Sequence, residues 1–152
     1  EIMPSLVGSE MCIRDRFDTD GYIHAYVHGI GRIGVLVDYQ VDNLDSQALR
    51  VVQDIAMQIA AMKAEFLDIN SIPSDVLERE KRILTEQARQ EGKPENIIEK
   101  VVEGRLKKFY QEKVLLEQPF IKDEKKTIRQ YIKENLPSLV IKRFVRYELG
   151  GV

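Results

Sequence analysis

Several residue types on which common functions depend are scarce in this sequence. It has no tryptophan and a single cysteine, Cys12, so no disulfide can form within the chain. A lone cysteine is typical of proteins from a reducing compartment. The sequence also has no run of about eighteen apolar residues, which excludes a membrane-spanning helix. The formal net charge of -2 gives no electrostatic reason to expect nucleic acid as the main partner.

What the sequence does contain indicates a globular domain with exposed helices. The 152 residues are enough for one domain with a buried core, and the hydrophobic fraction of 43% is ordinary for such a domain. The charged fraction of 32% is high, while only 7% of the residues are aromatic. This combination predicts one or more helices that project into solvent.

Residues 1–16 differ from the rest of the chain. They show no sustained helical or strand periodicity, and they lack the continuous apolar core of a signal peptide. The segment 5–16 resembles translated sequencing-adapter sequence. We interpret residues 1–16 as a non-native tail, and the alternative is a disordered native tail. Under either interpretation Cys12 carries no function.

Period-two alternation on both sides of a glycine-rich turn predicts a β-hairpin over residues 22–37. We expect a three-residue loop, Gly29–Gly31, which places His28 opposite Arg32. In this register one face of the hairpin is dry and the other carries aromatic and histidine side chains. The dry face is expected to hold Ile23, Ala25, Val27, Ile33, Val35 and Val37, and the other face Tyr22, His24, Tyr26, His28, Arg32, Gly34, Leu36 and Asp38.

A helix is predicted from about Asp45 to about Lys63, because capping side chains precede an apolar stripe of helical spacing. We expect this helix to pack across the dry face of the hairpin. The side chains predicted to be buried are Leu49, Val52, Ala56, Ile59 and Met62, and those predicted to point outward are Arg50, Gln53, Asp54 and Gln58.

Two charged helices, about 73–91 and about 95–113, are predicted to form an antiparallel coiled-coil arm. Gly92 suits the end of the first helix, and Pro94 suits the start of the second. Each helix carries only a narrow apolar stripe, and about twenty residues per helix give an arm roughly 30 Å long. Gly104 lies inside the second helix, where it predicts a close approach of another backbone.

The predicted fold class is α+β. After an irregular return over 115–123 and a short helix, residues 140–149 alternate as a third strand, with Ile141, Val145, Tyr147 and Leu149 expected on the dry face. The prediction for 17–150 is therefore a three-stranded antiparallel sheet covered by helices, with the arm of about 73–113 inserted between its parts.

The residues give no support for catalysis or metal binding. His24 and His28 lie about 13 Å apart along one strand, whereas two ligands of one zinc ion must lie within about 4 Å of each other. The sequence has no P-loop, no G-x-S-x-G motif and no evident pair of nucleophile and base. We therefore predict neither an enzyme nor a cofactor site, and interaction with a partner is the remaining function class.

The chain from Gly21 to Gly150 resembles the carboxy-terminal part of elongation factor Ts. The resemblance is carried by Tyr26–Val37 followed by Asp54–Phe66, by Gly92–Glu95 with Lys100–Phe109, and by Leu116–Ile121. These segments follow one another in the order found in the family, which makes the match far more specific than any short motif.

The resemblance implies a guanine-nucleotide exchange factor that acts in translation elongation in the bacterial cytoplasm or an organellar matrix. Such factors bind elongation factor Tu carrying GDP and promote the release of GDP. The implied contacts are His28 with Gly29, at the hairpin turn, and Ile121 with Lys122, after Gln118-Pro119-Phe120. Lys122 departs from relatives that often carry an apolar residue there. No cofactor, metal, membrane or direct nucleic-acid partner is implied.

The family's exchange wedge, a Thr-Asp-Phe-Val segment, is absent from these 152 residues, as is the family's amino-terminal helical domain. Asp18-Thr19-Asp20 is no substitute, because no phenylalanine follows. We expect the chain to bind elongation factor Tu weakly without exchanging nucleotide. Two alternatives stay open: an RNA-binding module that uses the charged arm and the sheet aromatics, and a purely structural dimerisation domain. A homodimer would form through the arm or the sheet.

Overall fold

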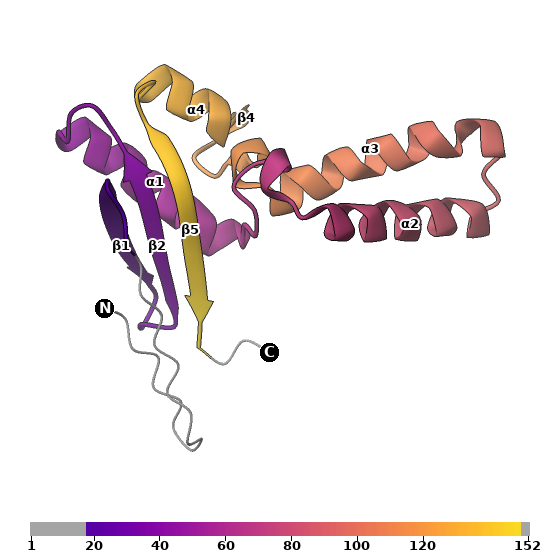
Figure 1. Cartoon of the computed structure of the whole chain (residues 1–152), viewed down its shortest axis with the longest axis horizontal. Helices are drawn as coiled ribbons and strands as arrows, with labels where there is room; N and C mark the ends of the chain where they lie inside the picture. Colours follow the sequence, from indigo (N-terminus) through magenta and orange to yellow (C-terminus); the bar gives the residue numbers. More distant parts are fainter. Residues whose placement is uncertain (1–17, 150–152) are drawn as a thin grey trace, which may run out of the picture.

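The computed structural model describes residues 18–149 and confirms the α+β class (Figure 1). The predicted tail 1–16, with Cys12, lies outside the described residues. The strands are β1 (Tyr22–His28), β2 (Ile33–Gln40), β3 (Pro119–Phe120), β4 (Asp123–Thr127) and β5 (Val140–Glu148). The helices are α1 (Ser46–Met62), α2 (Ser74–Gln90), α3 (Glu95–Lys113) and α4 (Ile128–Asn135), with short 3-10 turns at Ile69–Ser71 and Leu115–Glu117.

The main sheet has three antiparallel strands, as predicted, and the structure gives their order as β1-β2-β5. Helix α1 packs across one face, behind the sheet in the view of Figure 1. The core between them centres on Val37, Val52 and Ile55, all fully buried. The sheet thus has a covered face, against α1, and an open face.

The predicted register of the hairpin is wrong by one residue. The turn has four residues, 29–32, and His28 lies opposite Ile33 instead of Arg32. A shift of one residue moves every β1 side chain to the other face relative to β2. The residues of β1 on the covered face are consequently His24 and Tyr26, while Ile23, Ala25 and Val27 lie on the open face.

The packing of α1 explains this register. Val35, Val37 and Tyr39 on β2 are all buried at 2% exposure or less beneath the helix. In the observed register these residues pair with Tyr26, His24 and Tyr22. Long side chains on the edge strand β1 fill the space beside the helix. In the predicted register the short side chain of Ala25 would lie there and leave that space empty.

The sheet face predicted for the side chains of β5 is correct for Ile141 and wrong for Val145 and Tyr147. Ile141 pairs with Tyr39 on the covered face, but a bulge follows between Asp38 and Tyr39 of β2. Beyond a bulge the alternation of side chains changes face. Val145 and Tyr147 therefore lie on the open face, opposite Leu36 and Gly34.

Helix α1 has the predicted ends but a different buried stripe. The Asp45 side chain accepts a hydrogen bond from the Ala48 amide at 2.7 Å and caps the helix, which ends at Lys63 in the left-handed conformation. Leu49 and Met62, predicted to be buried, are 45% and 38% exposed. Gln58, predicted to point outward, is fully buried. The stripe is rotated because the helix also packs against α4 and the segment after the arm.

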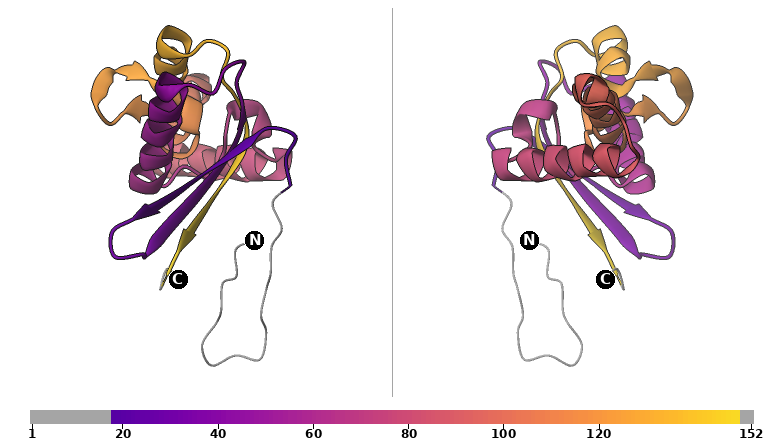
Figure 2. Two further views of the ribbon diagram at one scale, coloured as in Figure 1. Left: turned by 90° about the vertical axis from the view of Figure 1, so that its left-hand side faces the viewer. Right: turned by 90° about the vertical axis from the view of Figure 1, so that its right-hand side faces the viewer.

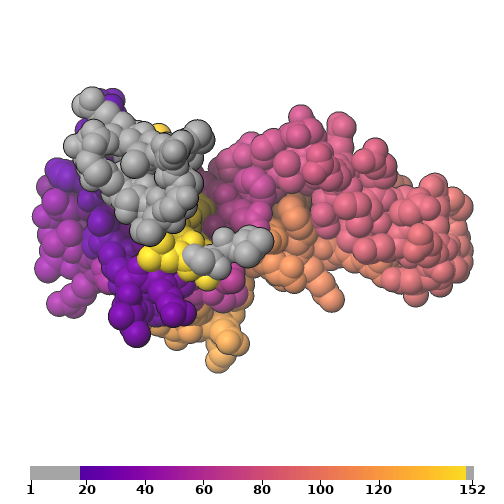
Figure 3. Space-filling view, turned by 90° about the horizontal axis from the view of Figure 1, so that it is seen from below, coloured from indigo at the N-terminus to yellow at the C-terminus, as the bar shows by residue number. Residues whose placement is uncertain are grey.

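Helices α2 and α3 form the predicted helical hairpin, which projects from the body of the molecule (Figures 1 and 3). Gly92 ends α2 with a φ of 74°. The hairpin has its own apolar cluster, formed by Leu84, Ala88, Ile98, Val102 and Leu106. The predicted close approach at Gly104 is wrong, since a β-carbon there would meet nothing within 4 Å.

The return after the arm is more regular than predicted. Strands β3 and β4 pair as a small antiparallel hairpin, and Ile121 and Lys122 form the connection between them. Helix α4 follows immediately, with a capping box formed by Thr127 and Gln130. This small hairpin is the second element that presents predicted contact residues.

Candidate functional site

The first predicted contact pair lies at the exposed end of the β1–β2 hairpin. His28 is the last residue of β1 and is exposed, and its Nδ1 lies 2.9 Å from the Tyr26 hydroxyl. Gly29 follows with a φ of 66°, a conformation that disfavours residues with a β-carbon. The turn therefore presents the His28 ring next to a backbone that carries no side chain.

The second predicted pair lies at the tip of the β3–β4 hairpin. Ile121 is 39% exposed, and its backbone amide donates a hydrogen bond of 2.9 Å to Gln58 Oε1. The Lys122 ammonium lies 2.5 Å from Asp54 Oδ1. An apolar and a cationic side chain thus stand side by side at a tip that is attached to α1.

Asp54 also accepts a hydrogen bond of 2.8 Å from the Tyr131 hydroxyl on α4. The Tyr131 ring stacks on Phe120 with a centroid separation of 4.2 Å. Burial raises the pKa of the Tyr131 phenol, and its hydrogen bond to the Asp54 carboxylate raises it further. The phenol consequently stays protonated and remains a donor across the neutral range.

Helix α1 connects the two turns. Gln53 Oε1 lies 2.6 Å from His24 Nε2 on β1, and the next residue, Asp54, holds Lys122. Figure 2 shows the β1–β2 turn at the lower end of the sheet and the β3–β4 hairpin near the top of the molecule, with α1 between them. We call His28, Gly29, Ile121 and Lys122 the two-turn site. The arrangement offers a surface for a macromolecule, with exposed groups on both flanks of one helix.

The two histidines have different environments. His24 is half-buried on the covered face and is engaged by Gln53, which matches a structural role. His28 is exposed at the turn, where its ring contacts the neighbouring Tyr26 hydroxyl. Of the two, only His28 has the accessibility that contact with a partner requires.

Sequence reasoning missed the residues that hold the β3–β4 tip, namely Gln58, Asp54 and Tyr131. One signal was available for Gln58. It continues the spacing of the buried residues Val51 and Ile55, so it lies on the apolar stripe despite its polar amide. No comparable signal marked Asp54, because its partners come from distant parts of the chain.

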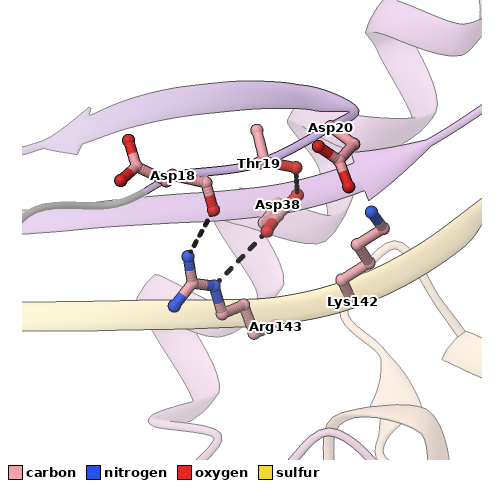
Figure 4. Close-up of a pocket in the computed structure, with 6 residues that line it drawn as sticks. All are labelled: Asp18, Thr19, Asp20, Asp38, Lys142 and Arg143. Atoms are coloured by element: carbon pink, nitrogen blue, oxygen red, sulfur yellow. Dashed lines mark hydrogen bonds and ion pairs between the residues drawn. The ribbon is translucent and has the colours of Figure 1, made fainter.

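A separate polar pocket lies on the open face of the sheet (Figure 4). Asp38 is only 2% exposed, and its carboxylate accepts hydrogen bonds from the Thr19 hydroxyl and from Arg143 Nε. The same guanidinium donates to the Asp18 carbonyl at 2.8 Å. The buried charge is thus compensated, and the pocket ties the segment before β1 to β5.

Residues 18–149 hold neither a cluster of metal-binding side chains nor a membrane-spanning helix. They contain no group of three or more His, Cys, Asp or Glu side chains that could hold a metal ion. None of the helices in this part of the chain is long and apolar enough to cross a membrane.

Comparison with known proteins gives the family. The family model described as Elongation factor TS matches residues 6–151. Elongation factor Ts of Aquifex aeolicus is 64% identical over 137 residues, which cover 90% of this chain and 47% of the relative. The protein of the same name from Hydrogenobaculum is 54% identical over 95% of this chain and 50% of the relative. That of Moorella thermoacetica is 46% identical over 87% of this chain and 69% of the relative. The chain belongs to the elongation factor Ts family.

Proposed function

We propose that this chain binds elongation factor Tu in its GDP-bound form through the two-turn site and serves GDP release during translation elongation. The observation that carries the proposal is the exposure of His28 and Ile121 on two turns that have α1 between them. The chain acts as a binding protein without catalytic chemistry or a cofactor. Its place is the bacterial cytoplasm or an organellar matrix.

Exchange requires a second element besides docking. The chain spans about half the length of the Aquifex and Hydrogenobaculum relatives, at 47% and 50%. The 152 residues hold no Thr-Asp-Phe-Val segment, which the family uses as its wedge. We therefore assign docking to this polypeptide and expect it to bind elongation factor Tu without accelerating GDP release by itself.

Two measurements on the same polypeptide test whether it binds elongation factor Tu without exchanging its nucleotide. Calorimetry with GDP-bound elongation factor Tu should give measurable binding, while release of a fluorescent GDP analogue should stay at the rate of elongation factor Tu alone. A full-length elongation factor Ts serves as the positive control for release. Stimulation close to that control would contradict the division, and absence of binding would contradict the proposal itself.

The contribution of His28 is tested against a matched histidine on the same strand. His28→Ala should weaken binding about 5- to 30-fold, the range typical of an interface side chain that matters. His24→Ala should lower the free energy of unfolding, because it removes the contact with Gln53, and should leave the affinity within about twofold. Equal losses of affinity would return both histidines to structural roles.

A second function, self-association, is favoured by the open face of the sheet. Val27 is 64% exposed there, Ile23 41% and Tyr147 37%. The arm buries Leu84, Ala88 and Ile98 within its own hairpin and exposes Ile83 at 42% and Ile97 at 38%, both less exposed than Val27. We infer that a homodimer would use the sheet and not the arm. Light scattering should show a dimer that Val27→Glu dissociates and that shortening of the arm at Gly92 leaves intact, and the reverse result would place the interface on the arm.

Nothing in the described residues favours the RNA-binding alternative. Most charges on the arm face solvent, and several pair with opposite charges, such as Arg105 with Glu91 at 2.6 Å. The aromatic residues Phe109 and Tyr110 lie edge to face at the base of α3 and form no row along the arm. A mobility shift with single-stranded RNA at low salt would revive this alternative.

A further inference from the structure

Gln58 is a fully buried polar residue on α1, within the stripe that packs against the rest of the core. A buried amide lowers stability unless each of its donors and acceptors finds a partner. Its partners therefore indicate what the residue does.

All the partners of Gln58 lie in the segment that leads to the β3–β4 tip. Its Nε2 donates to the Pro119 carbonyl at 3.0 Å and to Gln118 Oε1 at 3.2 Å. Its Oε1 accepts from the Ile121 amide at 2.9 Å. The Gln58 side chain thus bonds to the backbone on both sides of Phe120. The Pro119 carbonyl and the Ile121 amide cannot move without breaking these hydrogen bonds.

Gln118 completes the arrangement from the other side. It is also fully buried, and its Nε2 donates to the Glu112 carbonyl at 2.8 Å near the end of α3. The two amides therefore form a chain from α1 through the start of β3 to the base of the arm. No charged group takes part, so the geometry of these hydrogen-bonded amides does not depend on pH.

The tip has three further contacts, namely the strand pairing of Phe120 with Asp123, an ion pair and a ring stack. The Lys122 side chain is 54% exposed, and exposed ion pairs such as Lys122–Asp54 contribute little to stability. Phe120 is buried against Tyr131, but stacking leaves rotation of the neighbouring peptides open. The pairing of Phe120 with Asp123 closes the turn, and the Gln58 side chain holds the Ile121 amide inside it.

We propose that Gln58 is a positioning residue: it fixes the Pro119–Lys122 turn in the form that the partner recognises, without touching the partner itself. The inference rests on the proposed docking function: one buried amide holds the Ile121 peptide within the turn that the β3–β4 pairing closes. A preformed turn binds more tightly, because less conformational freedom is lost on association.

The local half of the inference is tested without a partner. Gln58→Met keeps the length of the side chain and removes all three hydrogen bonds. Amide exchange followed by NMR should show Ile121 exchanging at least about tenfold faster, the equivalent of one hydrogen bond, while the amides of α1 and β2 keep their rates. Unchanged exchange at Ile121 would overturn the inference.

The functional half uses binding to GDP-bound elongation factor Tu. Gln58→Met should weaken binding about 5- to 10-fold. The matched control, Val52→Ala, removes buried volume from the same helix at a residue that makes no hydrogen bond to the turn. It should lower the unfolding midpoint and leave the affinity within about twofold. Equal losses of affinity in the two variants would mean that Gln58 contributes only to the overall stability of the fold, which would overturn the inference.

A double-mutant cycle separates this inference from the proposed function. If Gln58 acts through the turn, Ile121→Ala should cost less affinity in the Gln58→Met chain than in the unmodified chain. Additive losses would overturn the positioning role even if the docking function holds. An unmodified chain that fails to bind would overturn the docking function, and exchange at Ile121 would still decide whether Gln58 fixes the turn.

Discussion

Single residues in this protein join elements that are distant in the sequence. Asp54 is the clearest example, because its two carboxylate oxygens hold Lys122 of the β3–β4 tip and Tyr131 of α4. Gln53 next to it engages His24 on β1. Neighbouring positions on one helix thus stabilise the surroundings of both contact turns.

The phenol of Tyr131 makes stability depend on pH in the alkaline range. Burial and the Asp54 carboxylate raise its pKa in the folded chain, whereas the unfolded phenol keeps a pKa of about 10. The unfolded state therefore loses the proton first, so the contribution of Tyr131 is complete below pH 10 and declines as the pH rises beyond it. Urea titrations at pH 8 and pH 10.5 should show a larger fall in the free energy of unfolding for the unmodified chain than for Tyr131→Phe.

The comparison with Tyr131→Phe is needed because lysines also titrate in this range. Phenylalanine keeps the ring that stacks on Phe120 and removes only the hydroxyl. An equal fall in the two proteins would show that neither burial nor the Asp54 carboxylate raises the pKa of Tyr131 in the folded chain.

At the scale of elements, the two glycines of the arm lie in different backbone conformations. Gly92 has a φ of 74° and ends α2, whereas Gly104 lies inside α3. A β-carbon at either position would meet nothing within 4 Å, so space does not distinguish them. The backbone conformation does.

We expect Gly104→Ala to raise the stability of the chain by about 0.5–1 kcal/mol, because alanine favours the helical conformation. Gly92→Ala should lower it by about 1 kcal/mol, since alanine is strained at positive φ. Thermal unfolding followed by circular dichroism at the helical band measures both. A destabilising Gly104→Ala would mean that this surface of the arm contacts something in solution.

At the scale of the whole molecule, residues 18–149 form two separate apolar cores. One lies between α1 and the sheet, and the other lies within the arm. They are linked at the base of the arm, where the Lys113 carbonyl accepts hydrogen bonds from the Glu65 and Phe66 amides. Separate cores make local unfolding of the arm energetically accessible.

Val102→Asp should therefore unfold the arm and leave the body folded. A buried charge in the small cluster has no partner, which destabilises that cluster by several kcal/mol. Hydrogen exchange with mass spectrometry should show loss of protection across α2 and α3 and retention in α1 and β2. The matched variant Ile55→Asp, in the main core, should remove protection everywhere. Global loss in Val102→Asp would show that the two cores fold as one unit.

The sequence by itself determined the helices, the strands of the main sheet and their order along the chain, but not the β3–β4 hairpin. Capping residues and the Gly92–Pro94 break fix the helix ends, and these signals act within a few residues. Alternation located β1 and β2, and the turn position singled out His28 over His24. Such features need no knowledge of what packs where.

Only the tertiary structure decided the register of the hairpin, the rotation of α1 and the role of Gln58. In β1 both faces carry side chains that can be buried, so alternation is compatible with a three- or four-residue turn. Packing against α1 selects the four-residue turn, which brings His24 and Tyr26 under the helix. Gln58 is buried because Gln118, Pro119 and Ile121, some sixty positions later in the chain, fold back onto it. Contacts between residues far apart in the sequence depend on the assembled fold, so local sequence patterns do not predict them.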